Sequence, residues 1–109
     1  MSFVKSFAPL AAPDATLLIL GSMPGEASLK AGEYYAHSRN AFWPIMGQLF
    51  GFDPSVAYDE RVRCLLTAGV AVWDVLASCH RVGSLDSEID DTSVAVNDFG
   101  DFFRQHPQI

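Results

Sequence analysis

Apolar residues along the chain gather in short continuous runs and in helical repeats. The run Thr16–Leu20, TLLIL, is bounded by Asp14 and Gly21, and the run 70–76, VAVWDVL, is apolar and rich in β-branched residues. Continuous runs of this length are typical of strands buried on both faces, as in parallel sheets covered by helices. We therefore predict two core strands, preceded by an extended, proline-containing lead-in over residues 6–15.

Helical spacing of apolar residues occurs in three further segments, 41–51, 55–69 and 96–107. Gly51 and Gly69 are suitable stops for the first two, because glycine accepts the left-handed conformation that often ends a helix. The positions expected to face the core are Phe42, Ile45, Met46 and Leu49 in the first helix, Val62, Leu65 and Leu66 in the second, and Phe99, Phe102 and Phe103 in the third.

The order of these elements is strand, long loop, two helices, strand, polar connection and helix. Such alternation predicts an α/β fold with a parallel sheet. The polar connection over 78–95 is expected to contain one helical turn, at 85–89. Two strands are few for such a sheet, so we interpret residues 1–109 as a single, C-terminally incomplete domain. An exposed sheet edge would then allow self-association.

Composition limits the function classes. The formal net charge of −6 and the sequence pI of about 4.7 argue against non-specific binding of nucleic acid. A local cationic patch and backbone amides can still hold DNA within an acidic whole. Cys64 and Cys79 are too few for a structural metal site or a disulfide framework, and we expect buried thiols in a reducing cytoplasm. No apolar run approaches the roughly 20 residues of a membrane span.

The loop over 21–39 carries the candidate chemistry. A glycine at the carboxyl end of a strand lets the backbone approach a ligand, and ligands of open α/β sheets bind at that edge. The spacing matches neither GxGxxG nor a P-loop, which disfavours a nucleoside triphosphate. Met23, at the centre of GSMPG, has no group that orients water. Tyr35 offers an aromatic face to a planar base, and the amide of Asn40 is suited to orienting water.

The segments LGSMPGEASLKAGEYYAHSRNAFW and VWDVLASCHRVGSLDSEI resemble the uracil-DNA glycosylase superfamily, and most closely its hypoxanthine (deoxyinosine) DNA glycosylase branch. The resemblance covers about residues 17–89. It implies a three-layer α/β/α fold with a short parallel sheet. It also implies a monofunctional, base-flipping enzyme of DNA base-excision repair that uses no metal and no cofactor. The expected partner is DNA that contains a deaminated base, hypoxanthine or uracil.

The resemblance also implies roles for individual residues. Other branches place Asp or Asn at the position of Met23 to hold the hydrolytic water, and here that role is expected to pass to Asn40. Tyr35 matches the aromatic residue on which the flipped base stacks, while Gly21, Ser22 and Met23 would supply backbone contacts. Further candidates are Ser28 and His37 for DNA phosphate, and Asp74 for substrate or water. The family's second motif, which pinches phosphate, would lie beyond Ile109.

Simpler interpretations stand beside these roles. Asn40 fits a helix N-cap, and one of the adjacent Tyr34 and Tyr35 is expected to be core packing. His37 fits an exposed loop residue and Asp74 an ordinary turn. Two other functions also remain open: a truncated, non-catalytic assembly module, and an enzyme or binder of free nucleosides, which the net acidity favours.

Overall fold

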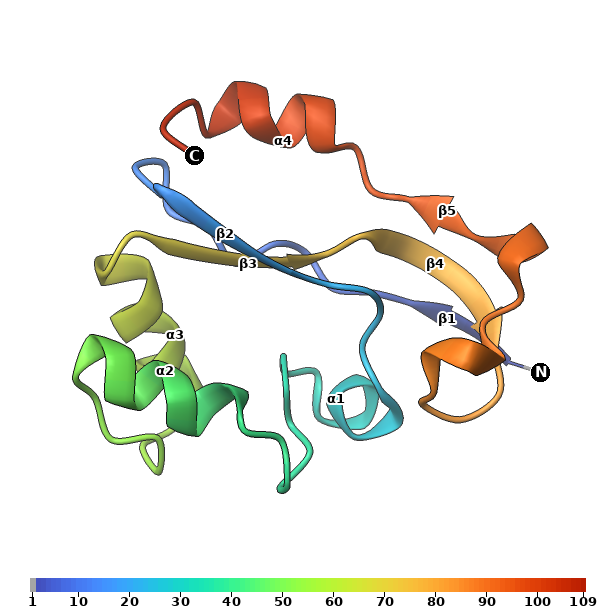
Figure 1. The fold of residues 1–109 in the computed structure, drawn as a ribbon, viewed down its shortest axis with the longest axis horizontal. Coiled ribbons are helices and arrows are strands. Elements are labelled where there is room, and N and C mark those ends of the chain that lie inside the picture. Colours follow the sequence, from blue (N-terminus) through green and yellow to red (C-terminus); the bar gives the residue numbers. More distant parts are fainter. Residues whose placement is uncertain (1) are drawn as a thin grey trace.

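The computed structural model describes residues 2–109 and shows strands with helices on both sides (Figure 1). Strands β2 (Leu17–Gly21) and β3 (Val70–Asp74) pair in parallel, with Gly21 opposite Asp74 at their carboxyl ends. On one side of this pair lie α1 (Glu26–Ala31), α2 (Phe42–Phe50) and α3 (Tyr58–Thr67), and on the other side lies α4 (Phe99–Gln105). These layers confirm the predicted α/β/α class with a short parallel sheet.

A second, antiparallel sheet was not predicted. It consists of β1 (Ser2–Lys5), β4 (Leu76–Arg81) and β5 (Ala95–Val96), in the order β1-β4-β5. Strand β4 continues the direction of β3 beyond a break at Val75 (Figure 1). The prediction of a polar connection from residue 78 was therefore wrong for its first residues, since they form β4. The helical turn expected at 85–89 is confirmed as η1 (Asp86–Glu88), and η2 (Asp91–Ser93) follows it.

Strand β3 is the centre of the fold, and every residue of it is buried. Successive side chains of a strand point to opposite faces. Val70 and Val72 accordingly join the core under α2 and α3, which also contains Tyr34, Trp43, Met46 and Leu65. Ala71 and Trp73 face α4 and pack with Ala15 and Phe102. The same alternation places Asp74 on the face of Val72, toward α1 and α2.

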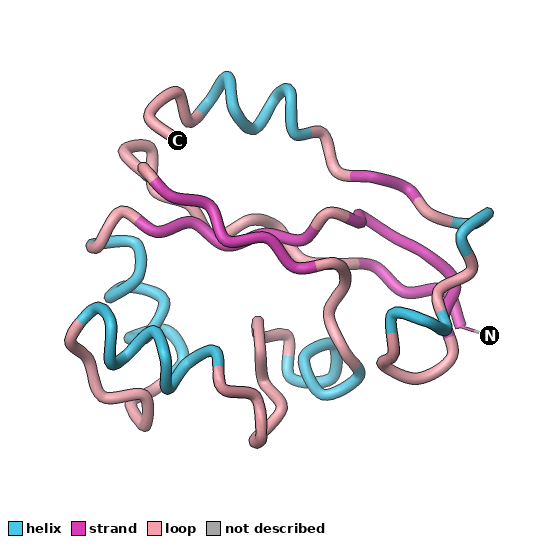
Figure 2. Tube along the Cα trace, in the orientation of Figure 1, coloured by secondary structure: helices cyan, strands magenta, loops and turns pink. Residues whose placement is uncertain are grey.

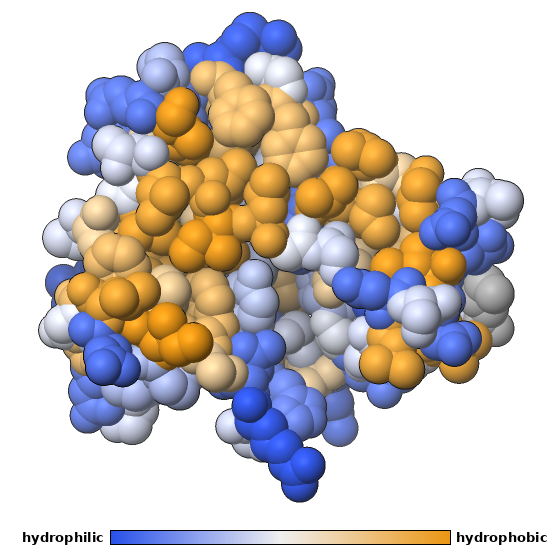
Figure 3. Space-filling view, in the orientation of Figure 1, coloured by the Kyte–Doolittle hydropathy of each residue, from blue (hydrophilic) through white to orange (hydrophobic). Residues whose placement is uncertain are grey.

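Strand β2 is only partly covered, which differs from the prediction of burial on both faces. Leu17 and Leu20 are 49% and 47% exposed. Within residues 2–109, β2 pairs only with β3, so its other edge is open. Figure 3 shows apolar side chains gathered over the strands on this face of the molecule. The lead-in segment covers the other edge of β3. There the Leu10 N–H donates to the Val72 carbonyl, and the Val72 N–H donates to the Leu10 carbonyl, both at 2.9 Å.

Helix α2 begins at Phe42, and its N-cap residue is Ala41 rather than the predicted Asn40. Trp43 and Met46 form its buried face. The prediction that Ile45 and Leu49 face the core was wrong, because they are 48% and 65% exposed. The reason is rotational: the helix buries the stripe of residues 43, 46 and 47, and a turn of about 100° per residue directs 45 and 49 away from it.

The other two helices follow their predicted patterns more closely. Leu65 of α3 is buried, and Gly69, just beyond the helix, adopts a φ of 82° as the chain turns into β3. On α4, Phe102 is buried against Trp73, with ring centroids 5.0 Å apart. Phe103 was predicted to face inward but is 43% exposed, since a short helix lying on one face of a sheet buries only one stripe.

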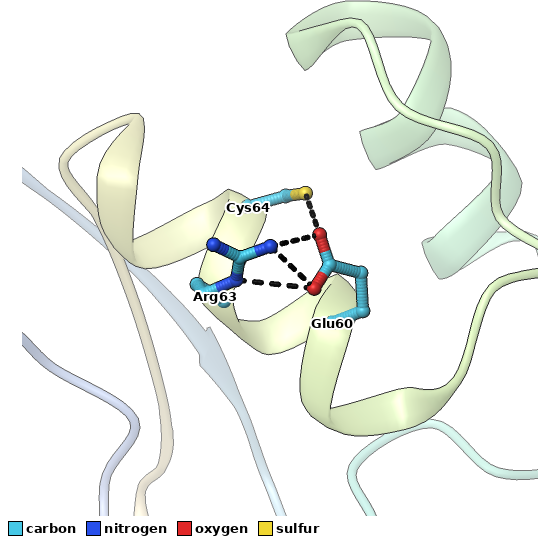
Figure 4. Close-up of polar contacts among 3 residues, drawn as sticks. All are labelled: Glu60, Arg63 and Cys64. Atoms are coloured by element: carbon cyan, nitrogen blue, oxygen red, sulfur yellow. Dashed lines mark hydrogen bonds and ion pairs between the residues drawn. The ribbon is translucent and has the colours of Figure 1, made fainter.

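Both cysteines are free thiols, Cys79 buried and Cys64 only half-buried. The Cys64 Sγ atom lies 3.9 Å from Glu60 Oε1 on the surface of α3, beside the ion pair of Glu60 with Arg63 (Figure 4). Such exposed ion pairs contribute little to stability. No helix within residues 2–109 has the length and apolar character needed to cross a bilayer.

Candidate active site

A cavity of about 410 Å³ lies at the carboxyl ends of β2 and β3, next to α1. Figure 2 shows that loop segments, rather than helices or strands, connect β2 to α1 and α1 to α2 around this region. The volume falls within the range of small-ligand pockets and can hold a single nucleobase. Its wall includes all the residues that the sequence singled out for chemistry: Gly21, Ser22, Met23, Ser28, Tyr35, His37, Asn40 and Asp74.

Gly21 allows two polar side chains to come together at the floor of the cavity. A Cβ atom at this position would collide with Asp74 Oδ1 and would lie 3.2 Å from the Tyr35 hydroxyl. Glycine is therefore required here by close approach rather than by an unusual backbone angle. Met23, two residues on, is buried and forms an apolar part of the wall.

Tyr35 is held in a strained conformation at the cavity. Its φ of 55° is the only positive value among the non-glycine residues described, and such strain often marks functional sites. Its ring stacks on Phe42, with centroids 3.9 Å apart and planes at 15°. One face of Tyr35 is thus covered, and a base can reach only the other. The adjacent Tyr34 is buried and donates its hydroxyl to the Ala8 carbonyl at 2.8 Å, so it is the structural member of the pair.

Asn40 combines a local structural contact with a place in the cavity wall. Its Oδ1 accepts a hydrogen bond from the Phe42 N–H at 2.8 Å, which satisfies a free donor at the start of α2. The side chain is exposed, and within residues 2–109 its amide nitrogen donates no hydrogen bond. The Asn40 amide therefore has donor capacity left for water or a base.

Asp74 is a buried ionisable group of the site. It is only 4% exposed, and its Oδ2 atom accepts no hydrogen bond from another described residue. Burial, reinforced by the negative charge of Asp86, raises the pKa of Asp74 to about 6. Asp74 also contributes, after burial, to the raised pKa of Tyr35. A buried carboxyl with a perturbed pKa in a cavity is typical of a functional group.

The two phosphate candidates differ in their surroundings. His37 is exposed, and its Nδ1 accepts a hydrogen bond from the Arg39 N–H at 3.1 Å. Ser28 is buried, and its hydroxyl oxygen accepts a hydrogen bond from the Ala36 N–H at 3.0 Å. Ser28 thereby ties α1 to the segment that carries Tyr35.

Sequence reasoning gave no role in the cavity to Ser84 and Asp86, which form a second part of its wall. Ser22 donates its hydroxyl to both carboxylate oxygens of Asp86 at 2.8 Å. Ser84 Oγ accepts a hydrogen bond from the Glu26 N–H at 2.8 Å, and Arg81 donates to the Pro24 carbonyl at 2.6 Å. The polar residues after VWDVL were the available signal, but only the tertiary fold shows that they reach the GSMPG loop.

The cavity is not accompanied by a cluster of metal-binding side chains among the described residues. No group of three or more His, Cys, Asp or Glu side chains within residues 2–109 is placed to hold a metal ion. A second, shallower cavity of about 290 Å³ lies beside α3, where its wall includes Phe50 and Phe52 together with the polar side chains of Glu60, Arg63 and Thr67. It shares no residue with the cavity at the strand ends.

Known proteins resemble the chain in sequence and in structure. Residues 8–105 match the model of the uracil DNA glycosylase superfamily. A hypoxanthine DNA glycosylase of Methanosarcina barkeri is 34% identical over 91 residues, which are 83% of this chain and 58% of that protein. A hypoxanthine DNA glycosylase of Methanosarcina acetivorans is 30% identical over 106 residues, which are 96% of this chain and 66% of that protein.

A solved structure agrees with these matches. The solution NMR structure of a candidate uracil DNA glycosylase from Methanosarcina acetivorans superposes with a TM-score of 0.84 at 30% identity, over 98% of this chain and 66% of that one. The chain thus spans about 58% to 66% of the length of the relatives that it matches. Sequence, fold and relatives agree with the resemblance carried by the GSMPG loop, and the chain belongs to the uracil DNA glycosylase superfamily.

Proposed function

We propose that this chain forms the base-binding site of a DNA glycosylase that hydrolyses the N-glycosidic bond of a deaminated base, hypoxanthine or uracil, in base-excision repair. One observation carries the proposal. A base-sized cavity brings together Tyr35, Asn40 and Asp74, in a chain whose curated relatives are named hypoxanthine DNA glycosylases. The target base must leave the duplex to enter this cavity, which costs a few kcal/mol and is easiest at a mispair.

The cavity supports binding of a flipped base by stacking. The base would stack on the face of the Tyr35 ring that Phe42 leaves free. Gly21, Ser22 and Met23 would lie along the edge of the base. The stack on Phe42 holds the Tyr35 ring in place before the base arrives. This arrangement gives Met23 a role as an apolar wall rather than as a chemical group.

Hydrolysis develops positive charge on the sugar and negative charge on the departing base. Asn40 would position the attacking water, because its amide nitrogen has donor capacity left. It would not act as the base, because a neutral amide does not accept a proton from water at neutral pH. Asp74 would contact the base or the same water. With a pKa of about 6 it is mostly ionised at neutral pH and accepts hydrogen bonds there, and it becomes neutral below that value.

Contact with DNA outside the cavity would be local, since the formal net charge is −6. His37 lies beside Arg39 in an exposed loop at the cavity, where it could meet a phosphate, and Ser28 supports that loop from beneath. With so few phosphate contacts, we expect the affinity for DNA to be low and to fall further as the salt concentration rises. We propose that the protein acts in the cytoplasm, where the thiols of Cys64 and Cys79 stay reduced.

Excision from a defined duplex tests the function. The full-length protein is incubated with a deoxyinosine-containing duplex, and abasic sites are then cleaved with alkali. Strand scission by the wild type, lost in Asn40→Ala but kept in Gln48→Ala, is the expected result. Gln48 is an exposed amide on α2 and so controls for loss of a surface amide. Equal scission by wild type and Asn40→Ala would refute the role of Asn40, and no scission by the wild type would refute the glycosylase.

Two alternatives to the DNA glycosylase are a binder of free nucleosides, which binding measurements distinguish, and a self-associating module, which a measurement of particle size distinguishes. The net charge of −6 favours a free nucleoside over DNA as the ligand, and calorimetric titration with inosine, uridine and duplex DNA distinguishes the two. The open edge of β2, with Leu17 and Leu20 exposed, favours self-association through strand pairing. Light scattering that finds a monomer would exclude the self-association.

A further inference from the structure

Arg81 ends β4 and lies buried beneath the GSMPG loop, where it is only 1% exposed. Its Nη2 donates to the Pro24 carbonyl at 2.6 Å, while Nε and Nη1 make no hydrogen bond with another described residue. The ion pairs among residues 2–109 are Glu60–Arg63 and Asp101–Arg104, so Arg81 has no carboxylate partner there. The one hydrogen bond that the guanidinium makes with another described residue is thus to a peptide carbonyl of the loop.

This arrangement does not serve stability. A guanidinium stays charged at any physiological pH. Burying a charge without a paired countercharge lowers stability, and an apolar side chain of similar volume often fills such a place without loss. The structure therefore keeps a destabilising group at Arg81, and what it gains in exchange is a short, charge-assisted hydrogen bond to Pro24.

The bond to Pro24 differs from the other contacts that hold the loop. The first two loop residues are held by backbone hydrogen bonds, from the Val75 N–H to the Gly21 carbonyl at 2.8 Å and from the Leu76 N–H to the Ser22 carbonyl at 3.1 Å. The other side-chain contacts, Ser22 with Asp86 and the Glu26 N–H with Ser84, are exposed and come from the segment after β4. The Arg81 bond is buried and comes from a strand that pairs with β1. Figure 1 shows the segment that follows β4, which contains η1, beside α1 and below the strands. A site is held more precisely from a strand than from a loop.

We propose that Arg81 is a positioning residue for excision: its buried guanidinium holds the Pro24 carbonyl and thereby fixes the second half of the loop, Met23 to Gly25, against the flipped base. Its effect on the reaction rests on the proposed glycosylase function. Because displacement of about 1 Å can cost on the order of a hundredfold in rate, a fixed loop favours the chemical step more than it favours binding.

The test compares Arg81→Met and Arg81→Lys with Arg104→Met in the full-length protein. Arg104 is exposed on α4, so its substitution makes the same charge change away from the cavity. Single-turnover excision of deoxyinosine from duplex DNA is expected to fall about tenfold to a hundredfold in Arg81→Met. Arg81→Lys is expected to retain part of the rate, because its ammonium can still bond to the Pro24 carbonyl, and Arg104→Met all of it. The Kd for the duplex is expected to change less than about twofold.

Stability separates positioning from a structural role. Arg81→Met is expected to unfold at the same Tm as the wild type or higher, since it removes a buried charge. Each of three outcomes for Arg81→Met would overturn the proposal: a loss of both excision rate and Tm, a failure to fold, or an excision rate equal to that of the wild type.

One readout does not depend on catalysis. The nitrogen of Gly25 shares a peptide unit with the Pro24 carbonyl, so its amide resonance reports the Arg81 bond. We expect that resonance to shift in Arg81→Met and not in Arg104→Met. An unshifted Gly25 resonance overturns the proposed contact. A shifted resonance in a protein whose wild type excises no base would instead refute the proposed function while leaving the contact in place.

Discussion

Replacing Asp74 with asparagine is expected to stabilise the protein at neutral pH while it impairs excision. The Asp74 carboxyl is buried, its Oδ2 has no described partner, and its pKa is raised from 3.8 to about 6, first by burial and then by Asp86. Keeping this group ionised in the folded state therefore destabilises the fold. Asparagine has almost the same shape and carries no charge.

The magnitude follows from the linkage between proton binding and folding. A pKa that is about two units higher in the folded state corresponds to ~3 kcal/mol, at about 1.4 kcal/mol per unit. Since the folded state binds this proton more tightly, the wild type loses stability as pH rises from about 4 to about 6, and the full deficit is present above that range. Asp74→Asn should thus be more stable than the wild type by ~3 kcal/mol at pH 7 and by little at pH 4.

Urea unfolding of the two proteins at several pH values between 4 and 8 measures this difference. At pH 7 the midpoint of Asp74→Asn should lie about 1 M or more above that of the wild type. Asp14→Asn, which removes an exposed carboxylate, serves as the matched control and should show no such change. A stability difference that is the same at pH 4 and pH 7, or an asparagine variant that is less stable at pH 7, would refute the reasoning.

Three further predictions concern the cavity. The excision rate should rise about tenfold between pH 5 and pH 7 as Asp74 ionises around pH 6, and a flat profile would show that its charge is not used. Gly21→Ala should lose excision, because its Cβ would collide with Asp74 Oδ1, whereas Gly25→Ala meets nothing nearer than 3.4 Å; equal activity of the two variants would contradict this. Phe42→Leu should weaken binding of the deoxyinosine duplex by about 0.5–1.5 kcal/mol, since it removes the ring stacked on Tyr35, and titration of fluorescently labelled DNA measures the loss.

Local signals in the sequence predicted the elements that depend on neighbouring residues. The continuous apolar run 70–76 identified β3, and the spacing of apolar residues identified α2, α3 and α4. A strand run and a helical repeat are visible in one stretch of chain, because each is set by a period of two or of 3.6 residues. The same kind of signal does not say which side of an element is covered.

Errors in the predicted burial arose where coverage depends on distant segments. Leu20 of β2 is exposed because no other strand within residues 2–109 pairs with its open edge. Phe103 is exposed because α4 contacts the sheet through Phe102. Both residues are apolar, so their sequence gave no sign of exposure. The pairing of β1 with β4 was missed for a related reason, since it joins residues about 75 positions apart.

The sequence by itself determined the α/β class, the superfamily resemblance and the residues Gly21, Tyr35, Asn40 and Asp74 as candidates, because these follow from local periodicity and from a distinctive motif. Only the tertiary structure decided how they meet. Parallel pairing sets Gly21 opposite Asp74, and burial there raises the pKa of that carboxyl. The fold also carries Arg81 beneath the loop, a contact over 57 positions that depends on strand pairing and cannot be derived from local pattern.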